Sequence, residues 1–448
     1  MIPPKPAARP EKVSLLRYLR LFRRDILSAQ PAKLYRAWMA EFRTPFFRSY
    51  LINQPELIRE VLQERPDDFP KSDRVSEGLR PLLGNSVFVT NGEVWKRQRR
   101  IIDPAFEGGR LRDTFQAMLA AGEACVARMQ PGLVEIEEAA SFAAADVIFR
   151  TLFSVPIEDK VASEVFRRFR SYQRAQPILN LAAFIPLPSW APRLFRPGTR
   201  KSARAIRGLI AGMVEKRQAE IEAGTAPDDL ATKIMTTPDP ETGEIFTAQE
   251  MVDQVAIFFL AGHETSASTL AWALYLLATH PEWQEKAAEE AQALSEDQSV
   301  AVMSKLKVSR DVFREALRLY PPVPMMVREA SKPEVFRKRD VKSGAMVVIS
   351  PWHLHRQERL WDNPDGFDPA RWQSENGQAC MRDAFIPFSA GARVCPGAGF
   401  AMFEGPLLLS LLVRAFRFAP SGNVPVPQAH LTVRSKDGIW LDLERRAQ

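Results

Sequence analysis

The sequence predicts a helix-rich α+β fold contained in one domain. Most of the chain between residues 108 and 320 has the apolar spacing of helices, and short runs of β-forming residues stand outside that region. The 35 prolines punctuate the helices, and no internal repeat, low-complexity linker or change of composition separates two units. We therefore expect a single domain over residues 1–448, with residues 1–25 as an N-terminal extension.

Seven central segments are predicted to be helices. The fifth starts at Thr247-Ala248-Gln249-Glu250, a capping box in which each end residue accepts a hydrogen bond from the backbone of the other. Pro281 follows this helix and suits the first position of the next one, where an N–H is not needed. The predicted helices cover residues 108–129, 138–152, 159–174, 200–223, 247–280, 281–294 and 309–320, and a further apolar run over 400–416 has helical patterning.

Strands are predicted near the two ends of the chain. Asp437-Gly438 is a strong signal for a two-residue hairpin turn, so we expect the strands on either side of it to pair with each other. The predicted strands cover residues 46–52, 346–350, 431–436 and 439–443.

Composition narrows the class of protein. Hydrophobic residues make up 46% and charged residues 26%, which is ordinary for a globular protein with a large core. The net charge of +7 is spread along the chain and does not argue for nucleic acid, but it allows a local basic face for an acidic protein partner. The three cysteines, Cys125, Cys380 and Cys395, form no metal-type cluster and fit a reducing compartment.

Membrane insertion is not expected. Five charged side chains interrupt the apolar residues between positions 15 and 27, which excludes a secretory signal or a membrane anchor of the usual kind. The longest apolar stretch, residues 251–277, contains acidic and hydroxyl side chains and is typical of a buried helix. We expect a cytoplasmic, bacterial-type protein with no transmembrane segment.

One segment near the C-terminus, residues 388–397, suits the binding of heme. A cysteine thiolate is a strong axial ligand for heme iron, and Cys395 stands here between Arg393 and Gly397. Arg393 could meet a heme propionate with charge-assisted hydrogen bonds, and Gly397 would allow the backbone to approach the porphyrin. Phe388 would shield the sulfur from water.

A second unusual segment lies in the middle of the long predicted helix. Gly262 costs roughly 1 kcal/mol relative to alanine in a helix interior, and Glu264 beside Thr265 needs hydrogen-bond partners in an apolar helix. We interpret the segment as an oxygen-activation groove, in which the small Ala261 and Gly262 leave room, Thr265 bonds dioxygen and a water, and Glu264 relays protons. The alternatives are a Thr265 hydroxyl bonded to the preceding turn and a Glu264 satisfied by a salt bridge; His263 is interpreted as structural.

Both segments resemble the cytochrome P450 superfamily. Residues 388–397 fit F-x-x-G-x-R-x-C-x-G at every position, and residues 261–265 fit A-G-x-[DE]-T. The resemblance implies a helix-rich P450 fold with a long helix over the heme, heme b held by Cys395, and a soluble heme-thiolate monooxygenase. Such an enzyme inserts one oxygen atom from O2 into a hydrophobic small molecule.

The resemblance extends to a supporting frame. The family's E-x-x-R and P-x-R motifs correspond to Glu315, Arg318 and Arg371, which implies a buried network that fixes the cysteine loop. Trp95 and Arg99 fit W-x-x-x-R, and Arg328 fits another arginine that binds a propionate; a surface basic helix is the alternative for Arg99.

The substrate pocket is predicted to be apolar, and residues 177–195 are predicted to form an apolar lid. We expect a terpenoid, a fatty acyl chain or an alkyl-aromatic compound as substrate, with a slight preference for the fatty acyl class. The predicted lining comprises Leu79, Leu82, Val87, Phe88, Phe258, Ala261, Met325 and Met326.

Electrons are expected from an external ferredoxin or flavodoxin with its reductase, because the sequence has no flavin, iron–sulfur or nicotinamide motif. Two other functions stay open: a peroxide-driven or isomerising heme-thiolate enzyme, and a non-catalytic heme binder or sensor. The predicted docking face comprises Lys96, Arg97, Arg100, Arg112 and Arg382.

Overall fold

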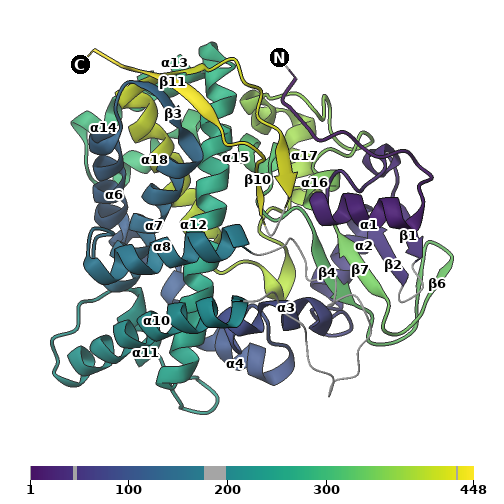
Figure 1. The fold of residues 1–448 in the computed structure, drawn as a ribbon, viewed down its shortest axis with the longest axis horizontal. Helices are drawn as coiled ribbons and strands as arrows, with labels where there is room; N and C mark the ends of the chain where they lie inside the picture. Colours follow the sequence, from purple (N-terminus) through teal and green to yellow (C-terminus); the bar gives the residue numbers. More distant parts are fainter. Residues whose placement is uncertain (1, 44–47, 176–197, 430–431, 448) are drawn as a thin grey trace.

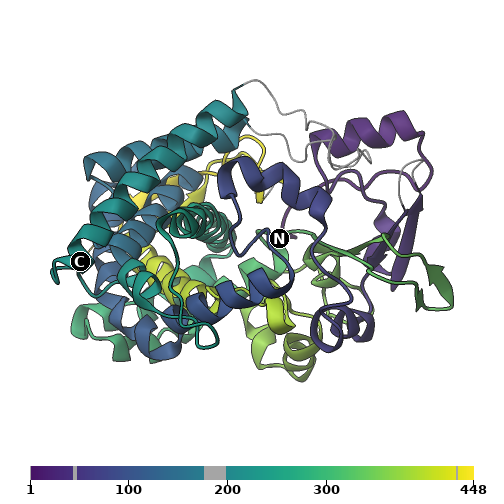
Figure 2. The same ribbon diagram turned by 90° about the horizontal axis from the view of Figure 1, so that it is seen from below.

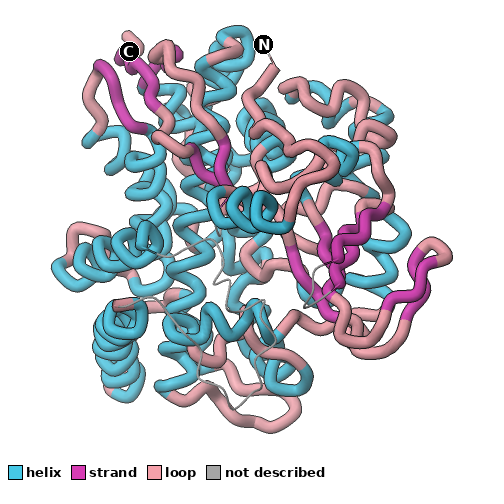
Figure 3. Tube along the Cα trace, turned by 45° about the vertical axis from the view of Figure 1, so that its right-hand side comes forward, coloured by secondary structure: helices cyan, strands magenta, loops and turns pink. Residues whose placement is uncertain are grey.

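The computed structural model describes residues 2–43, 48–175, 198–429 and 432–447. The predicted lid, residues 177–195, lies outside these ranges. Helices make up most of the molecule and small sheets stand at its edges, which confirms the predicted α+β class (Figures 1 and 3). Nine of the described helices are introduced here, and the others are described with the core below. The nine are α1 (Leu15–Arg24), α2 (Pro55–Arg59), α3 (Asp73–Leu83), α4 (Gly92–Ile102), α8 (Lys160–Ala175), α11 (Leu230–Thr236), α14 (Ala293–Glu296), α16 (Pro351–Leu354) and α17 (Glu375–Asp383).

The centre of the fold is α12 (Ala248–Ala278), which starts at the predicted capping box. Thr247 Oγ1 accepts from the Glu250 N–H at 3.2 Å, and Glu250 Oε2 accepts from the Thr247 N–H at 2.9 Å. Figure 2 looks along α12 and shows other helices around it. The helices that pack on α12 include α7 (Ile136–Phe153), α10 (Thr199–Glu222), α13 (Pro281–Glu290), α15 (Lys307–Leu319), α18 (Ala398–Ala415) and also α3.

Helix α6 (Phe115–Arg128) packs on α7 and α18 and completes the core on the side of these two helices. The sequence predicted one helix over residues 108–129, and this is wrong: α5 (Gly108–Asp113) ends at Thr114. The Thr114 hydroxyl donates to the Leu111 carbonyl at 2.7 Å, so the side chain satisfies an acceptor at the end of the helix. Among the described helices, only α18 is long and apolar enough to cross a membrane, and 61% of it is buried in the core.

The main sheet has the order β1-β2-β7-β4, with β2 (Arg48–Ile52) parallel to β7 (Met346–Ile349). The edge strands β1 (Met39–Arg43) and β4 (Met326–Glu329) run antiparallel to their neighbours. The four strands bring the segment after α15 next to the N-terminal region. A separate hairpin consists of β5 (Glu334–Phe336) and β6 (Arg339–Val341).

The predicted C-terminal hairpin is wrong. Gly438 does form a turn with φ of +80°, but the strands before and after it join different sheets. β10 (Val433–Ser435) pairs with β9 (Pro427–Ala429), whereas β11 (Trp440–Arg445) lies between β3 (Gly132–Glu135) and β8 (Phe416–Pro420). The turn residues were recognised correctly, but the partners are set by distant segments that the local sequence does not specify.

Candidate active site

The cysteine loop connects α17 to α18 and leaves the Cys395 sulfur accessible. The Cys395 N–H donates to the Phe388 carbonyl at 2.9 Å, which closes the loop, and α18 begins three residues after the sulfur. Desolvation raises the pKa of Cys395, while the Gly397 N–H, Arg99 and Lys71 favour the thiolate. Desolvation is the larger effect, and the backbone N–H and the two cations oppose it.

Gly391 allows this loop to sit against the N-terminal region. Its φ is +68°, and a Cβ there would collide with the Leu62 carbonyl oxygen. Glycine is therefore required twice at this position, for its backbone angle and for the close approach. Gly397 differs, because a Cβ there would lie 3.8 Å from the Cys395 sulfur in ordinary contact.

Four cations lie close enough to influence one another beside Cys395. They are Lys71, Arg99, Arg328 and Arg393. Burial and the neighbouring Arg393 lower the pKa of Arg328 to about 10, and burial lowers the pKa of Arg393 to about 10. The pKa of Lys71 is lowered well below its usual value by burial and then by the three arginines.

Three of these cations, Lys71, Arg328 and Arg393, have no carboxylate partner within the described part of the chain. Arg328 is 5% exposed, and its side chain donates to one acceptor among the described residues, the neighbouring Val327 carbonyl, at 3.2 Å. A buried cation without a counter-ion, such as Arg328, is costly, and Lys71 and Arg393 are partly buried beside it, so this cluster suits a ligand with two negative charges. The two propionates of a heme supply those charges, and the adjacent sulfur suits its iron.

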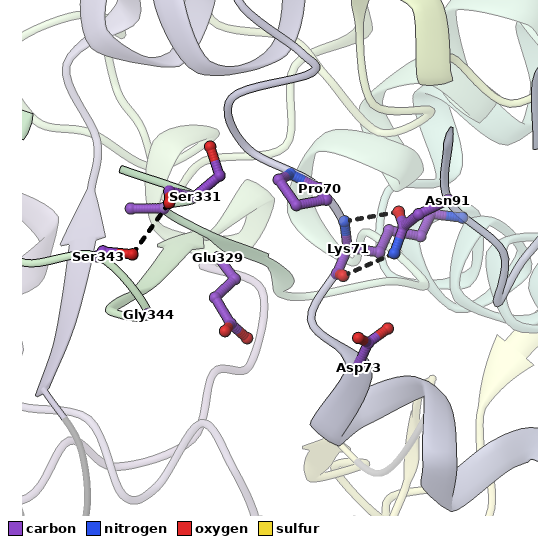
Figure 4. Close-up of a pocket in the computed structure, with 9 residues that line it drawn as sticks. Pro70, Lys71, Asp73, Asn91, Glu329, Ser331, Ser343 and Gly344 are labelled. Carbon is purple, nitrogen blue, oxygen red and sulfur yellow. Dashed lines mark hydrogen bonds between the residues drawn. The ribbon is translucent and has the colours of Figure 1, made fainter. Parts of the chain in front are cut away.

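Asn91 connects two of the cations. Its Oδ1 accepts from the Lys71 N–H at 3.1 Å and from Arg393 Nη2 at 2.9 Å, and its Nδ2 donates to the Lys71 carbonyl at 3.0 Å. Figure 4 shows Asn91 turned toward the backbone of Lys71, beside a hollow that also exposes Asp73 and Glu329. That hollow is polar and is not the apolar pocket that the sequence predicts. Sequence reasoning missed Lys71, because no motif or spacing distinguishes it from other lysines.

Trp95 and Arg99 of α4 were predicted to bind a propionate, and Arg99 is already engaged by protein groups. The Arg393 guanidinium lies 4.1 Å from the centre of the Trp95 ring, so Trp95 faces the cation cluster. Arg99, however, pairs with Asp103 at 2.7 Å and donates to the Val394 carbonyl at 2.6 Å. Arg99 therefore contacts the residue before Cys395 and helps to hold the cysteine loop.

One face of α12 is accessible in an otherwise buried helix. Between residues 251 and 278 only Phe258, Ala261, Gly262 and Thr265 are not buried. Their spacing of i, i+3, i+4 and i+7 places them on one side of the helix. The predicted groove thus corresponds to a continuous stripe. A Cβ at Gly262 would lie 2.6 Å from Ile148 Cδ1 of α7, so a larger residue there would require the Ile148 side chain to shift.

The acid and the hydroxyl of α12 have different surroundings. The Thr265 hydroxyl donates to the Ala261 carbonyl at 2.6 Å, which is the alternative that the sequence left open. Glu264 is 5% exposed and faces the C-terminal segment, where it accepts from the Thr432 hydroxyl at 2.6 Å and pairs with Arg434 at 2.8 Å. Gln173 of α8 bonds the other carboxylate oxygen.

His263 is buried and faces the Phe259 carbonyl at 2.5 Å, and burial lowers its pKa. The structure therefore gives His263 the contacts of a core residue.

A buried carboxylate joins two arginines under the cysteine loop. Arg318 donates twice to Glu315 at 2.8 and 2.9 Å, and Arg371 donates at 3.0 Å. The three side chains are at most 5% exposed. Other N–H groups of the two guanidiniums bond the backbone carbonyls of residues 355, 362, 363, 364 and 366. The structure brings together the network that the sequence predicted.

The network reaches the cysteine loop through His355. Arg318 donates to the His355 carbonyl at 2.9 Å, and His355 Nε2 accepts from the Ile386 N–H at 3.0 Å. Ile386 lies two residues before Phe388, where the loop begins. Burial lowers the pKa of His355 to about 3, so the ring is neutral and can accept this bond.

The predicted pocket residues come from three segments. Leu82 and Val87 are buried, and Phe258 packs edge-on against Phe106 with ring centres 5.8 Å apart. Phe88, predicted to line the pocket, is 40% exposed, and Lys71 Nζ lies 4.6 Å from the centre of its ring. Leu79, Met325 and Met326 are partly buried and pack on the core.

Residues 30–440 match the cytochrome P450 family. The chain belongs to this family. It is 32% identical over 393 residues to cyclooctat-9-en-7-ol 5-monooxygenase of Streptomyces melanosporofaciens, covering 85% of this chain and 83% of the relative. It is also 30% identical to human cytochrome P450 4A11 over 84% of this chain and 76% of that protein.

The P450 family is a heme-thiolate family, so heme b is the cofactor of this protein and its activity is that of a monooxygenase. The cation cluster and the accessible sulfur are consistent with that cofactor.

Replacing Glu315 with alanine should abolish stable heme binding. Two buried guanidiniums would lose their carboxylate, and breaking such a network costs about 3–5 kcal/mol. Heme content per protein and the midpoint of denaturant unfolding measure the effect. Glu285 is a matched control, because it also pairs with two arginines, Arg417 and Arg446, but is 41% exposed. Glu285→Ala should cost about 1 kcal/mol or less, and equal losses in the two variants would contradict the prediction.

Proposed function

We propose that this P450 hydroxylates or epoxidises an apolar small molecule, with Cys395 as the axial ligand. The accessible stripe of α12 would line the reaction site. The observation that carries the proposal is the exposed Cys395 next to three cations, Lys71, Arg328 and Arg393, which have no carboxylate partner among the described residues. Heme, when bound, supplies the activation of dioxygen and the transfer of one oxygen atom. Lys71, Arg328 and Arg393 would hold its propionates, with Trp95 against Arg393.

The pocket residues support an apolar substrate. The side chains predicted to line the pocket on α3, α12 and the segment before β4 are aliphatic, aromatic or thioether groups. They would exclude water and orient the substrate by shape. The Streptomyces relative acts on cyclooctat-9-en-7-ol according to its name, which favours a terpenoid-like substrate; fatty acyl chains and alkyl-aromatics are the other candidates.

We assign proton delivery to Glu264 and Thr265. Arg434 is 35% exposed on its side chain while Glu264 is 6% exposed, so the ion pair leads from solvent to the buried carboxylate. Thr265 presents its hydroxyl on the accessible stripe, one residue further along the helix. Release of its bond to the Ala261 carbonyl would free the hydroxyl to donate into the reaction site.

Electrons would come from an external ferredoxin or flavodoxin, and we place the enzyme in a bacterial cytoplasm. The Streptomyces relative supports a bacterial setting.

The docking face that we propose for the electron donor contains fewer residues than the sequence suggested. Lys96, Arg97 and Arg100 pair with Glu93, Glu250 and Asp239, respectively, at 2.6–2.9 Å. Within the described ranges Arg112 and Arg382 are exposed and have no ion pair.

Cys395→Ala should remove the red-shifted absorbance of the reduced carbonyl complex, because that band requires a thiolate ligand. Cys125→Ala and Cys380→Ala should keep it, since these thiols are buried and burial raises the pKa of each to about 11. Reduced difference spectra of the three variants give the answer. A retained band in Cys395→Ala would exclude this residue as the ligand.

Thr265→Ala should retain heme and substrate binding but divert reducing equivalents to peroxide. Loss of one positioned proton donor costs on the order of 10²-fold in productive turnover. Glu264→Gln should act in the same direction. The ratio of product to NAD(P)H consumed measures the effect.

Two controls accompany this test. Thr265→Ser keeps the hydroxyl and should keep coupling, and Thr269→Ala removes a hydroxyl one turn further along α12 that is 1% exposed. Unchanged coupling in both Thr265→Ala and Glu264→Gln would remove these residues from the mechanism and favour a peroxide-driven or isomerising enzyme.

Purified protein with NADPH alone should be inactive, and a ferredoxin with its reductase should restore turnover. Reduction by the partner should slow as salt rises, because charges more than ~10 Å apart are screened at 0.1 M. Arg112→Glu and Arg382→Glu should slow reduction in stopped-flow experiments without changing substrate binding. Lys96→Glu serves as the comparison, because Lys96 already pairs with Glu93. Turnover with NADPH alone would exclude an external donor, and salt-independent reduction would exclude this docking face.

A further inference from the structure

A second acidic residue lies behind the reaction site and has no role in the mechanism above. Glu404 is on α18, nine residues after Cys395, and is 1% exposed. Ser266 Oγ of α12 donates to its Oε2 at 2.7 Å. Its Oε1 is buried and has no hydrogen-bond partner, and no cation pairs with it among the described residues.

These surroundings do not support a carboxylate ion. Glu315 shows what a buried carboxylate needs, since it receives three guanidinium bonds and the Asp368 N–H. Glu404 receives one hydroxyl, and an unpaired charge at such a site is strongly unfavourable. Burial raises the pKa of Glu404 to about 8, while the Ser266 bond opposes that shift. The side chain is therefore mainly neutral at pH 7.

The hydrogen bond between Ser266 and Glu404 connects α12 to α18 next to Thr265. Ser266 directly follows Thr265, and α12 and α18 pack against each other. A bond from α18 to Ser266 therefore ties the turn with the proposed proton donor to the helix that follows the iron ligand. A protonated carboxyl can both accept from a hydroxyl and donate to one, so it can maintain this bond without a buried charge.

We propose that Glu404 is a neutral carboxylic acid that fixes the Thr265 turn of α12 to α18 through Ser266. It is a positioning residue, since it acts on the site through Ser266 and does not itself lie on the accessible stripe. It differs from Glu264, which is ion-paired and faces the C-terminal segment. The inference rests on the proposed role of Thr265, and the experiments below separate the two.

The protonation state can be measured on the holoenzyme by infrared spectroscopy. A protonated carboxyl has a C=O stretch that is separate from the amide bands and shifts in D2O. Glu404→Gln should remove such a band at pH 7. Glu137→Gln is the control, because Glu137 is a partly buried carboxyl whose pKa is also raised by desolvation, to about 7, and which bonds the Ser435 N–H and not a residue of α12. An unchanged carboxyl band in Glu404→Gln would show that Glu404 is ionised and overturn the proposal.

The positioning role can be measured by coupling and by the C–O stretch of the reduced carbonyl complex. Glu404→Met and Ser266→Ala each remove the tie. We expect each to lower the ratio of product to NAD(P)H about fivefold, the factor for one net hydrogen bond of about 1 kcal/mol. We also expect each to broaden or shift the C–O stretch, because carbon monoxide would occupy the side of the heme that faces α12. The double variant should be no worse than either single one.

Two further variants complete the series. Glu404→Gln should keep both coupling and the C–O stretch, because the amide can still bond Ser266. Ser410→Ala is a matched control, since Ser410 of α18 bonds Ser309 of α15 at 2.8 Å and should affect neither signal. If Thr265→Ala uncouples the enzyme but Glu404→Met and Ser266→Ala change nothing, this inference alone is wrong. If Thr265→Ala does not uncouple, the proposed mechanism fails, and the C–O stretch still decides whether Glu404 positions the turn.

Discussion

The buried carboxylate of Glu315 is the constraint on which the site depends. Two guanidiniums converge on it, and their other N–H groups bond a cluster of loop carbonyls that no regular sheet or helix satisfies. Irregular backbone is stable in a core only when such groups are paired. Because Arg318 also fixes His355, and His355 accepts from Ile386, this one carboxylate contributes to the position of the cysteine loop. The loop then needs no regular hydrogen-bond pattern of its own.

The two acids of α12 and α18 are both buried but have different partners. Glu264 pairs with the partly exposed Arg434 and bonds Thr432 and Gln173, whereas Glu404 has one hydroxyl partner, Ser266. Desolvation therefore favours the neutral form of Glu404. Helix α12 thus contacts the C-terminal segment through an ion pair at Glu264 and contacts α18 through the hydroxyl of Ser266.

Sequence predicted the parts of this protein that depend on local chemistry. The capping box of α12, the stripe that includes Ala261 and Thr265, and the meeting of Glu315 with two arginines all follow from residues a few positions apart or from family motifs. The C-terminal strands were mispaired, because the partners of β10 and β11 come from distant segments. Lys71 was missed for a related reason: its chemistry appears only when three remote arginines surround it. The ion pairs that occupy Lys96, Arg97 and Arg100 are equally invisible in a linear sequence.

The cation cluster has a consequence for how the protein matures. Lys71, Arg328 and Arg393 lie beside the cysteine loop without a carboxylate partner among the described residues and repel one another, so the folded chain without cofactor carries an electrostatic penalty. A ligand that neutralises them stabilises the folded state by its binding free energy, through thermodynamic linkage. Cofactor supply and folding yield are therefore coupled. In a cell short of porphyrin, a fraction of newly made chains would remain partly unfolded and would be degraded by proteases. The amount of folded enzyme would therefore follow heme availability even at constant expression.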